Sequence, residues 1–204
     1  MRRSANSMRT RKTRTEYFEQ LSEEELYRHA ANRALYILEH TDKSEADLRR
    51  KLKETGYPED IIERAVEYVR GYHYIDDARF ALNYVRIHAA AISRRELSNK
   101  LLQKGISRED IDAAFSAFEE EQADIARRRA DADPDGASEE RLSTEEQAAV
   151  NALRKKLNGR RPADEDDKRK LVAFMYRKGF GRDAIRRAFD ILDVSIDHEQ
   201  EYYQ

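Results

Sequence analysis

Residues 97–118 read LSNKLLQKGISREDIDAAFSAF, and the same pattern occurs twice more in the chain. The other two copies align with this one without gaps on a glycine, and they read LRRKLKETGYPEDIIERAVEYV at 48–69 and LVAFMYRKGFGRDAIRRAFDIL at 171–192. Self-similarity of this kind is the sequence signature of a repeat architecture. The 204-residue chain is therefore interpreted first as copies of one unit.

Each copy has the pattern of two helices joined at the glycine. Before the glycine, apolar residues recur at a spacing of four, as Leu97 and Leu101 do, which places them on one face of a helix. Gly56, Gly105 and Gly179 stand where a residue in the left-handed conformation would end that helix. After the glycine, an i, i+3, i+4, i+7 pattern predicts a second helix. Its core face is Ile62, Ala65, Val66 and Val69 in the first copy, Ile111, Ala114, Phe115 and Phe118 in the second, and Ile185, Ala188, Phe189 and Leu192 in the third.

The starts of these helices are also marked. Several serines are followed three residues later by an acidic residue, which is the spacing of a capping box: Ser44 with Asp47, Ser93 with Glu96, and Ser107 with Asp110. Pro58 falls where a first-turn proline is tolerated in the second helix of the first copy.

A third helix is predicted ahead of each pair. In the first copy it covers 25–40, with core positions Leu26, Ala30, Ala34, Leu35 and Leu38, and in the second it covers 76–91, with Phe80, Ala81, Tyr84, Val85 and His88 along one side. The glycines are 49 residues apart between the first two copies (105 minus 56) and 74 apart between the last two (179 minus 105). We assign the excess of 25 to a loop around DADPDGASEE (131–140), after which the helical pattern resumes over 147–159.

These patterns predict an all-α protein, with tandem three-helix repeats that form an elongated, curved array. The expected divisions are a basic flexible tail over 1–22, repeat 1 over 23–70, repeat 2 over 71–120, and repeat 3 over 121–200 with an acidic insertion around 130–147. The composition agrees, because 39% of residues are charged and only seven are glycine and three proline. No segment has the alternation expected of a strand.

Composition also excludes several classes of protein. The chain has no cysteine, so disulfides and thiolate metal sites are excluded and a reducing compartment is favoured. No apolar run is long enough to span a bilayer, and the basic N-terminus lacks the apolar core of a secretory signal. We expect a cytoplasmic protein without membrane contact, with a monomer as the simplest oligomeric state.

Charge is unevenly distributed along the chain. Residues 1–15 contain six basic side chains and no acidic ones, whereas residues 119–147 contain eleven Asp or Glu against four Arg. The acidic stretch is interpreted as a solvated insertion. The basic tail is equally consistent with disorder without function and with contact to nucleic acid.

The stretch HYIDDARF (73–80) raises the question of an acidic catalytic or metal site. Asp76 and Asp77 fall where the leading helix of the second copy begins, so we interpret them as helix-capping residues. The five histidines show no metal-ligand spacing, and no phosphate-binding or dinucleotide-binding loop and no nucleophile elbow occurs. We predict no catalytic residue, no cofactor and no metal, and therefore no enzyme.

Two stretches carry a family resemblance. YIDDARFALNYV (74–85), followed by SRRELSNKLLQKGISREDI (93–111), resembles the signature of the RecX family of regulatory proteins, which are built from tandem three-helix repeats. The resemblance extends over about residues 25–195 and is weakest over 121–165. It implies binding to the RecA protein and its filament on single-stranded DNA, and inhibition of ATP hydrolysis, strand exchange and the repressor cleavage that RecA stimulates. Whether such a protein would block filament growth or bind in the filament groove is left open by the sequence.

Basic residues at corresponding places in the repeats are the candidate contacts with RecA or with DNA phosphates, which gives weak direct DNA contact as a secondary expectation. They are Arg49, Arg50 and Lys51 in the first repeat, Arg94, Arg95, Lys100 and Lys104 in the second, and Arg177 and Lys178 in the third. Arg79 is a further candidate, which the resemblance implies because it lies in the matching motif at 74–85. The alternative is that they form the ordinary solvated faces of amphipathic helices. Two other functions also stay open, a general DNA-binding protein and a helical scaffold for another partner. The first is disfavoured because we see no helix-turn-helix signature and no aromatic platform for bases.

Overall fold

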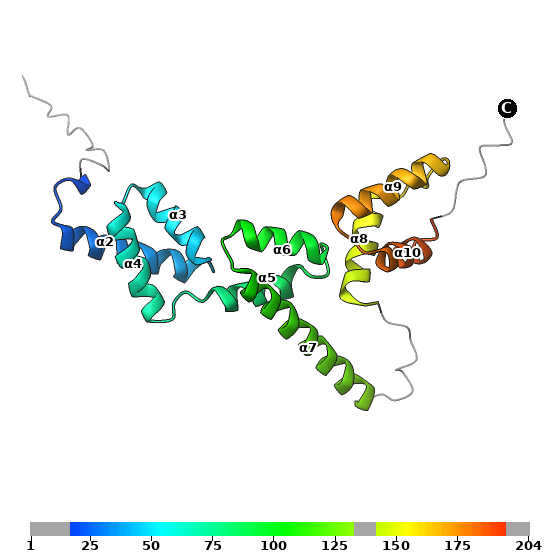
Figure 1. The fold of residues 1–204 in the computed structure, drawn as a ribbon, viewed down its shortest axis with the longest axis horizontal. Coiled ribbons are helices and arrows are strands. Elements are labelled where there is room, and N and C mark those ends of the chain that lie inside the picture. The colour runs from blue at the N-terminus through cyan, green and yellow to red at the C-terminus, as the bar shows by residue number, and fades with distance from the viewer. Residues whose placement is uncertain (1–16, 133–141, 195–204) are drawn as a thin grey trace, which may run out of the picture. The chain divides into compact units, whose positions relative to one another are not determined.

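The computed structural model describes residues 17–132 and 142–194, and every regular element within these two ranges is a helix (Figure 1). In chain order the helices are α2 (Glu23–His40), α3 (Glu45–Thr55), α4 (Glu59–Gly71), α5 (Asp77–His88), α6 (Arg94–Gln103), α7 (Arg108–Ala132), α8 (Thr144–Leu157), α9 (Glu165–Lys178) and α10 (Arg182–Ile191). The chain divides into two compact units, one up to Asp76 and one from Asp77 onward. The predicted all-α fold with tandem helical repeats is confirmed.

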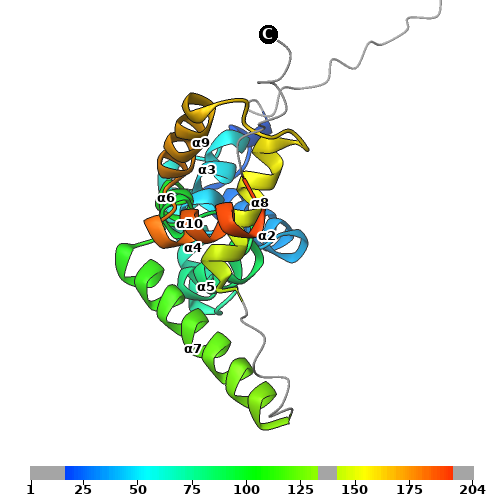
Figure 2. The ribbon, with the colours of Figure 1, turned by 90° about the vertical axis from the view of Figure 1, so that its right-hand side faces the viewer.

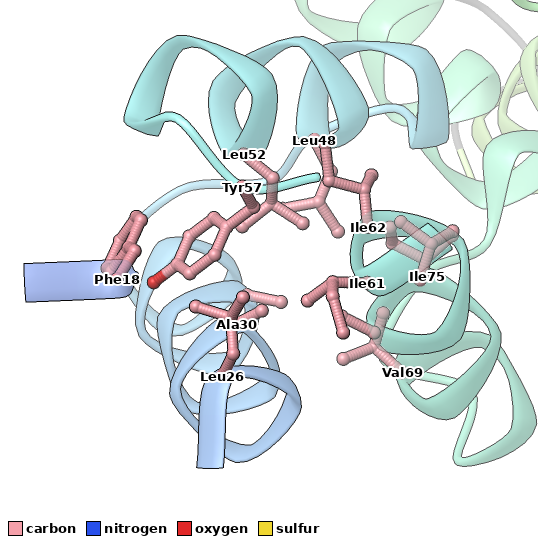
Figure 3. Packing of buried hydrophobic residues seen from close by; sticks show 13 residues of the cluster. Phe18, Leu26, Ala30, Leu48, Leu52, Tyr57, Ile61, Ile62, Val69 and Ile75 are labelled. Carbon is pink, nitrogen blue, oxygen red and sulfur yellow. The ribbon is translucent and has the colours of Figure 1, made fainter. Parts of the chain in front are cut away.

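The first unit contains α2, α3 and α4, which enclose one hydrophobic core. Leu48, Leu52 and Ile62 are fully buried in it, and α4 packs along α2. Figure 3 shows these side chains converging between the three helices, with the rings of Phe18 and Tyr57 face to face at one edge. The two ring centroids are 4.7 Å apart. The repeat therefore has its own core, as expected when each helix presents one apolar face.

The second unit contains the other two repeats, each around a core of its own. In the second repeat α5 packs along α7, and the core gathers around Val85, Leu101 and Phe115. In the third repeat α8 packs along α10, and the core gathers around Leu153 and Met175.

The second and third repeats also meet through hydrogen bonds. One joins the turn after α5 to α8, where Asn151 Nδ2 donates to the Ala90 carbonyl oxygen at 3.0 Å. The two cores of this unit are therefore linked by polar contacts as well as by the chain.

Most predicted core positions are buried. Leu35, Leu38, Tyr84, His88, Phe118, Phe189 and Leu192 are partly buried, whereas the remaining predicted positions of the helix faces are buried. The periodicity missed one position, which is the residue directly after each glycine: Tyr57, Ile106 and Phe180 are at most 4% exposed. This residue continues the chain inward from the helix end, where a contact with the core commonly accompanies a left-handed cap.

Helix ends follow the predicted signals with one correction. Gly56, Gly105 and Gly179 all have positive φ, and Ser44 and Ser93 each accept a hydrogen bond from the backbone N–H three residues later, at 3.2 and 3.1 Å. Pro58 is the N-cap of α4 and lies just outside the helix, so its placement in the first turn was wrong.

The acidic stretch begins as part of a helix. α7 continues to Ala132, so residues 119–132 are helical and run through the expected boundary at 120, and the segment 133–141 lies outside the described residues. α8 begins at Thr144, three residues before the expected start, and its N-cap Ser143 forms a capping box with Glu146. The other expected domain boundaries stay predictions.

α5 begins at Asp77, directly after Asp76, which agrees with the interpretation of this pair as the start of a helix. Across residues 17–132 and 142–194, no group of three or more His, Asp or Glu side chains is arranged to hold a metal ion. None of the helices in these ranges is long and apolar enough to cross a bilayer.

Candidate functional site

The candidate residue Arg49 of the first repeat is held in a network of ion pairs within its own unit. Its Nε and Nη2 donate to the two carboxylate oxygens of Glu63 at 2.8 and 2.9 Å, and its Nη1 donates to Glu45. Arg70 on α4 donates to the same Glu45 at 2.8 and 2.5 Å. The network joins α3 to α4, so the charge of Arg49 is used inside the repeat.

The pKa values of this network favour the charged forms. Burial raises the pKa of Glu45, but hydrogen bonds from Arg70 and Arg49 outweigh it and lower that pKa overall. Hydrogen bonds from Arg49 lower the pKa of Glu63, and those with Glu63 and Glu45 raise the pKa of Arg49. Each group is therefore ionised at neutral pH, and the network is intact there.

The neighbouring candidates on α3 are also paired. Arg50 Nη2 lies 2.6 Å from Oδ1 of Asp47, whose side chain is buried, and Lys51 Nζ lies 2.7 Å from Glu54 Oε2. The structure thus gives Arg49, Arg50 and Lys51 partners within the first repeat.

In the second repeat, Arg94 and Lys100 also have internal partners. Arg94 forms an ion pair with Glu119 on α7, and its guanidinium carbon lies 4.1 Å from the ring centroid of Phe115. Lys100 Nζ lies 3.9 Å from Glu96 Oε1, one turn earlier on α6. Both cations therefore contribute to packing around α6.

Lys104 and Arg79 lie at other places in the same repeat. Lys104 Nζ is 5.6 Å from the ring centroid of Phe80 and 5.9 Å from that of Tyr84, within the range of a cation–π interaction. Arg79 is exposed in the first turn of α5.

Three candidates meet in a cleft of about 380 Å³ between α6 and α9. Lys178 Nζ lies 3.4 Å from Glu96 Oε2, so one carboxylate is shared between lysines of two repeats. Arg95 and Arg177 have no carboxylate partner anywhere in the described parts of the chain. The cleft is lined by Arg95, Glu96 and Asn99 from α6 and by Phe174, Arg177 and Lys178 from α9.

A close approach of α6 to the end of α9 positions this cleft. Ser93, the buried N-cap of α6, donates from Oγ to the Lys178 carbonyl oxygen at 2.6 Å while accepting from the Glu96 backbone N–H. A Cβ added at Gly179 would lie 2.8 Å from the Cβ of Arg95, so only glycine leaves room for this approach. The glycine that ends α9 therefore also fixes the distance between two repeats.

The chemistry of the cleft is that of an anion-binding site. Two guanidinium groups offer planar pairs of donors that suit carboxylates or phosphates, and Asn99 adds an amide. With three cationic side chains against one carboxylate, the cleft has a net positive charge. Sequence reasoning named Arg95, Arg177 and Lys178 but missed Asn99 and Phe174, which carry no charge signal. A stripe extending to the first repeat stays a prediction.

The structure also shows an aromatic cluster that sequence reasoning missed. Tyr68, Tyr72 and Tyr74 lie at the end of α4 and just after it, and all three are exposed, Tyr72 by 65%. Neighbouring ring centroids are 4.9 and 6.4 Å apart. The first repeat therefore presents exposed tyrosines that the sequence analysis did not consider as an aromatic platform, and whether bases stack on them stays a question for experiment. The signal in the sequence is three tyrosines, spaced by four and two residues, around Val69, the last buried residue of α4.

Family models match all three repeats. The RecX first three-helix domain matches residues 30–68, the RecX second three-helix domain matches 76–114, and the RecX third three-helix domain matches 144–189. The chain is 35% identical over 103 residues to "Regulatory protein RecX" of Clostridium acetobutylicum, covering 50% of this chain and 48% of that protein. It is 27% identical over 169 residues to the protein of the same name from Clostridium botulinum strain Eklund 17B, covering 81% and 68%. The first of these matches thus spans about half of the relative's length.

Solved structures of the same name share the fold. A "Crystal structure of regulatory protein RecX" has a TM-score of 0.59 at 23% identity, covering 89% of this chain and 79% of that one. The RecX structure from Lactobacillus salivarius has a TM-score of 0.55 at 17% identity, covering 83% and 98%. The helical repeats described above are therefore an architecture already seen by experiment.

Proposed function

The chain belongs to the RecX family of regulatory proteins, and from this premise we propose that it binds the RecA recombinase filament and inhibits its activities. The inhibited activities are ATP hydrolysis, strand exchange and the stimulation of repressor cleavage, so the protein would modulate recombination and the SOS response. It would act by binding and carry out no catalysis of its own. Action on a RecA filament would place it in the cytoplasm, and we expect it to act as a monomer.

The observation that carries the proposal is the match of all three repeats to RecX domains. The cleft between α6 and α9 supports it, because Arg95 and Arg177 have no carboxylate partner among the described residues and can bind carboxylates on a protein surface or phosphates in a filament. The paired cations of α3 support it less, since their charges are already satisfied within the repeat.

The rate of DNA-dependent ATP hydrolysis tests the proposal. RecA is assembled on single-stranded DNA, and the protein is added at amounts below one molecule per RecA protomer. We expect inhibition well below a 1:1 ratio, which would indicate control of filament growth or length. An unchanged rate with RecA of verified activity would contradict the proposed function.

Direct contact with single-stranded nucleic acid is a second candidate, and the exposed tyrosines favour it. Tyr68, Tyr72 and Tyr74 offer faces on which bases can stack. Binding to a fluorescent single-stranded oligonucleotide without RecA would test this function. Affinity that falls steeply with salt would indicate phosphate contacts, and loss of affinity in Tyr72→Ala would indicate stacking. Absence of binding at low salt would leave RecA as the proposed partner.

A further inference from the structure

The second helix of the second repeat is much longer than its counterparts. α7 has 25 residues, whereas α4 has 13 and α10 has 10. Figures 1 and 2 both show its later part running on past α5 and α6. α5 supports it as far as Glu121, which accepts a hydrogen bond from Arg86 Nε at 2.9 Å. The residues from 122 to 132 form a projecting segment.

The core-facing side of α7 continues along this projecting segment. Ile111 and Phe115 are buried in the repeat core, and Phe118 is partly buried against it. Continuing from Phe118 at steps of four and three leads to Gln122 and Ile125, so these residues lie on the same side of the helix. Ile125 is 40% exposed. The core-facing side of α7 therefore carries an apolar residue, Ile125, beyond the core of the repeat.

This face forms one wall of a groove of about 470 Å³. The groove is also lined by Leu142, just before α8, by Thr144 at the start of α8, and by Leu97 and Phe115 of the repeat core. The volume falls in the range of ligand sites. The wall from residue 118 to residue 129 is about 17 Å long at the helical rise of ~1.5 Å per residue. These dimensions suit apolar side chains presented from one face of a helix.

The charges of the groove add a constraint on its occupant. Arg94 and Glu119 pair with each other at its edge. Arg129 on the α7 wall and Glu145 on the α8 wall have no ion-pair partner within residues 17–132 and 142–194. A complementary occupant would carry a carboxylate on the side facing Arg129 and a cation on the side facing Glu145, with apolar side chains between them.

We propose that this groove docks an amphipathic helix of the partner protein. The helix would insert apolar side chains spaced by three or four residues against Phe118 and Ile125, and would set a carboxylate against Arg129 and a cation against Glu145. This contact is separate from the anion-binding cleft between α6 and α9. The inference rests on the proposed function for the identity of the partner, so the RecA filament on single-stranded DNA is the probe.

Paired variants test the groove by inhibition of RecA ATP hydrolysis. Ile125→Asp has a matched control in Ile87→Asp, because Ile87 is 73% exposed on α5 and does not line the groove. Arg129→Glu has a matched control in Arg128→Glu, one residue earlier on the same helix. We expect the half-inhibitory concentration to rise roughly tenfold or more for Ile125→Asp, because an apolar contact is lost. We expect a rise of several-fold for Arg129→Glu and little change for either control.

The two possible failures are distinguishable. Normal inhibition by the unaltered protein with equal potency of Ile125→Asp and Ile87→Asp would overturn the groove and leave the proposed function standing. Absence of inhibition by the unaltered protein would overturn both. Thermal unfolding of each variant shows that the fold is kept, which the exposed position of Ile125 predicts.

Photo-cross-linking identifies the occupant directly. A photoreactive amino acid replaces Gln122, which is exposed and lines the groove, and the control carries it at position 87. The variant is irradiated with purified RecA filaments, and the linked peptides are identified by mass spectrometry. A cross-link from position 122 to a helix of RecA supports the inference. Cross-links only to a second copy, only to residues 195–204 of the same chain, or to nothing overturn it.

Discussion

The basic residues of α3 and those of the cleft between α6 and α9 have opposite surroundings, although both groups lie on the middle helix of a repeat. On α3, Arg49 is bound by Glu63 and Glu45, and Arg50 by the buried Asp47. In the cleft, Arg95 of α6 and Arg177 of α9 line opposite helices, and neither has a carboxylate partner in the described ranges. Basic residues at matching positions of a repeat alignment are therefore of two kinds, paired and unpaired, and only the ion-pair geometry separates them.

We expect the apolar cores beneath the charged surfaces of the repeats to be similarly stable. Phe115 is 4% exposed and supports both the core of the second repeat and the guanidinium of Arg94. We expect Phe115→Ala to lower the free energy of unfolding by about 3–5 kcal/mol, through lost burial and a cavity. Thermal or urea unfolding measures the change. An unaltered unfolding midpoint would refute the packing described for this repeat.

Gly56 and Gly179 occupy the same position in different repeats but have different surroundings. At Gly56 an added Cβ has 4.0 Å to its nearest neighbour, so Gly56→Ala should cost only the left-handed backbone, about 1–2 kcal/mol. At Gly179 the same Cβ meets Arg95 at 2.8 Å, and Gly179→Ala should cost a further ~1–3 kcal/mol of overpacking. Urea unfolding of the two variants gives the difference. Equal destabilisation would show that α6 and α9 do not approach closely.

Charge reversal in the cleft tests whether its unpaired arginines act on the partner. We expect Arg95→Glu with Arg177→Glu to weaken inhibition of RecA by about tenfold or more, because two donors to an anion are replaced by repelling groups. Helical content by circular dichroism should stay the same. Arg169→Glu with Arg186→Glu is the control with an equal charge change. Both arginines are highly exposed, and among the described residues their ion pairs are with Asp166 and Asp183 of their own helices. Equal inhibition by the two double variants would remove the cleft from the proposed interface.

The network of α3 should respond to pH, with a smaller effect. Arg49→Gln should lower the free energy of unfolding by about 1 kcal/mol at neutral pH, the range of partly exposed ion pairs. The pKa values of Glu45 and Glu63 are lowered in the folded protein, so their contribution is present above the ordinary glutamate pKa of about 4.3 and is lost as the pH falls through the lower folded values. The difference between unaltered protein and variant should therefore shrink from pH 7 to pH 3. A constant difference would contradict an electrostatic origin.

The sequence predicted the cores well because helical periodicity is a local signal. Ile62, Val66, Leu97 and Leu101 follow from spacing alone, and they are buried. The cleft could not be predicted in the same way, since Arg95 and Arg177 are 82 residues apart (177 minus 95) and meet only through contacts between repeats.

Local patterns also hid which cations were already paired. The spacing of four between Glu45 and Arg49 was readable, but the pairing of Arg49 with Glu63 depends on how α3 packs against α4. The length of α7 was missed for a related reason, because its acidic composition was interpreted as an insertion although glutamate, which opens this stretch at 119–121, is a good helix former.

The hydroxyl of Ser93 takes part both in capping a helix of its own repeat and in contacting the next repeat. It accepts from the Glu96 amide and donates to the Lys178 carbonyl oxygen, so the first turn of α6 is completed by the same group that holds the third repeat. Partial unfolding of the third repeat would break the hydrogen bond from this hydroxyl to Lys178 and make the first turn of α6 less stable. Solvent exchange of the Glu96 amide hydrogen therefore reports from within the second repeat how often the third one detaches.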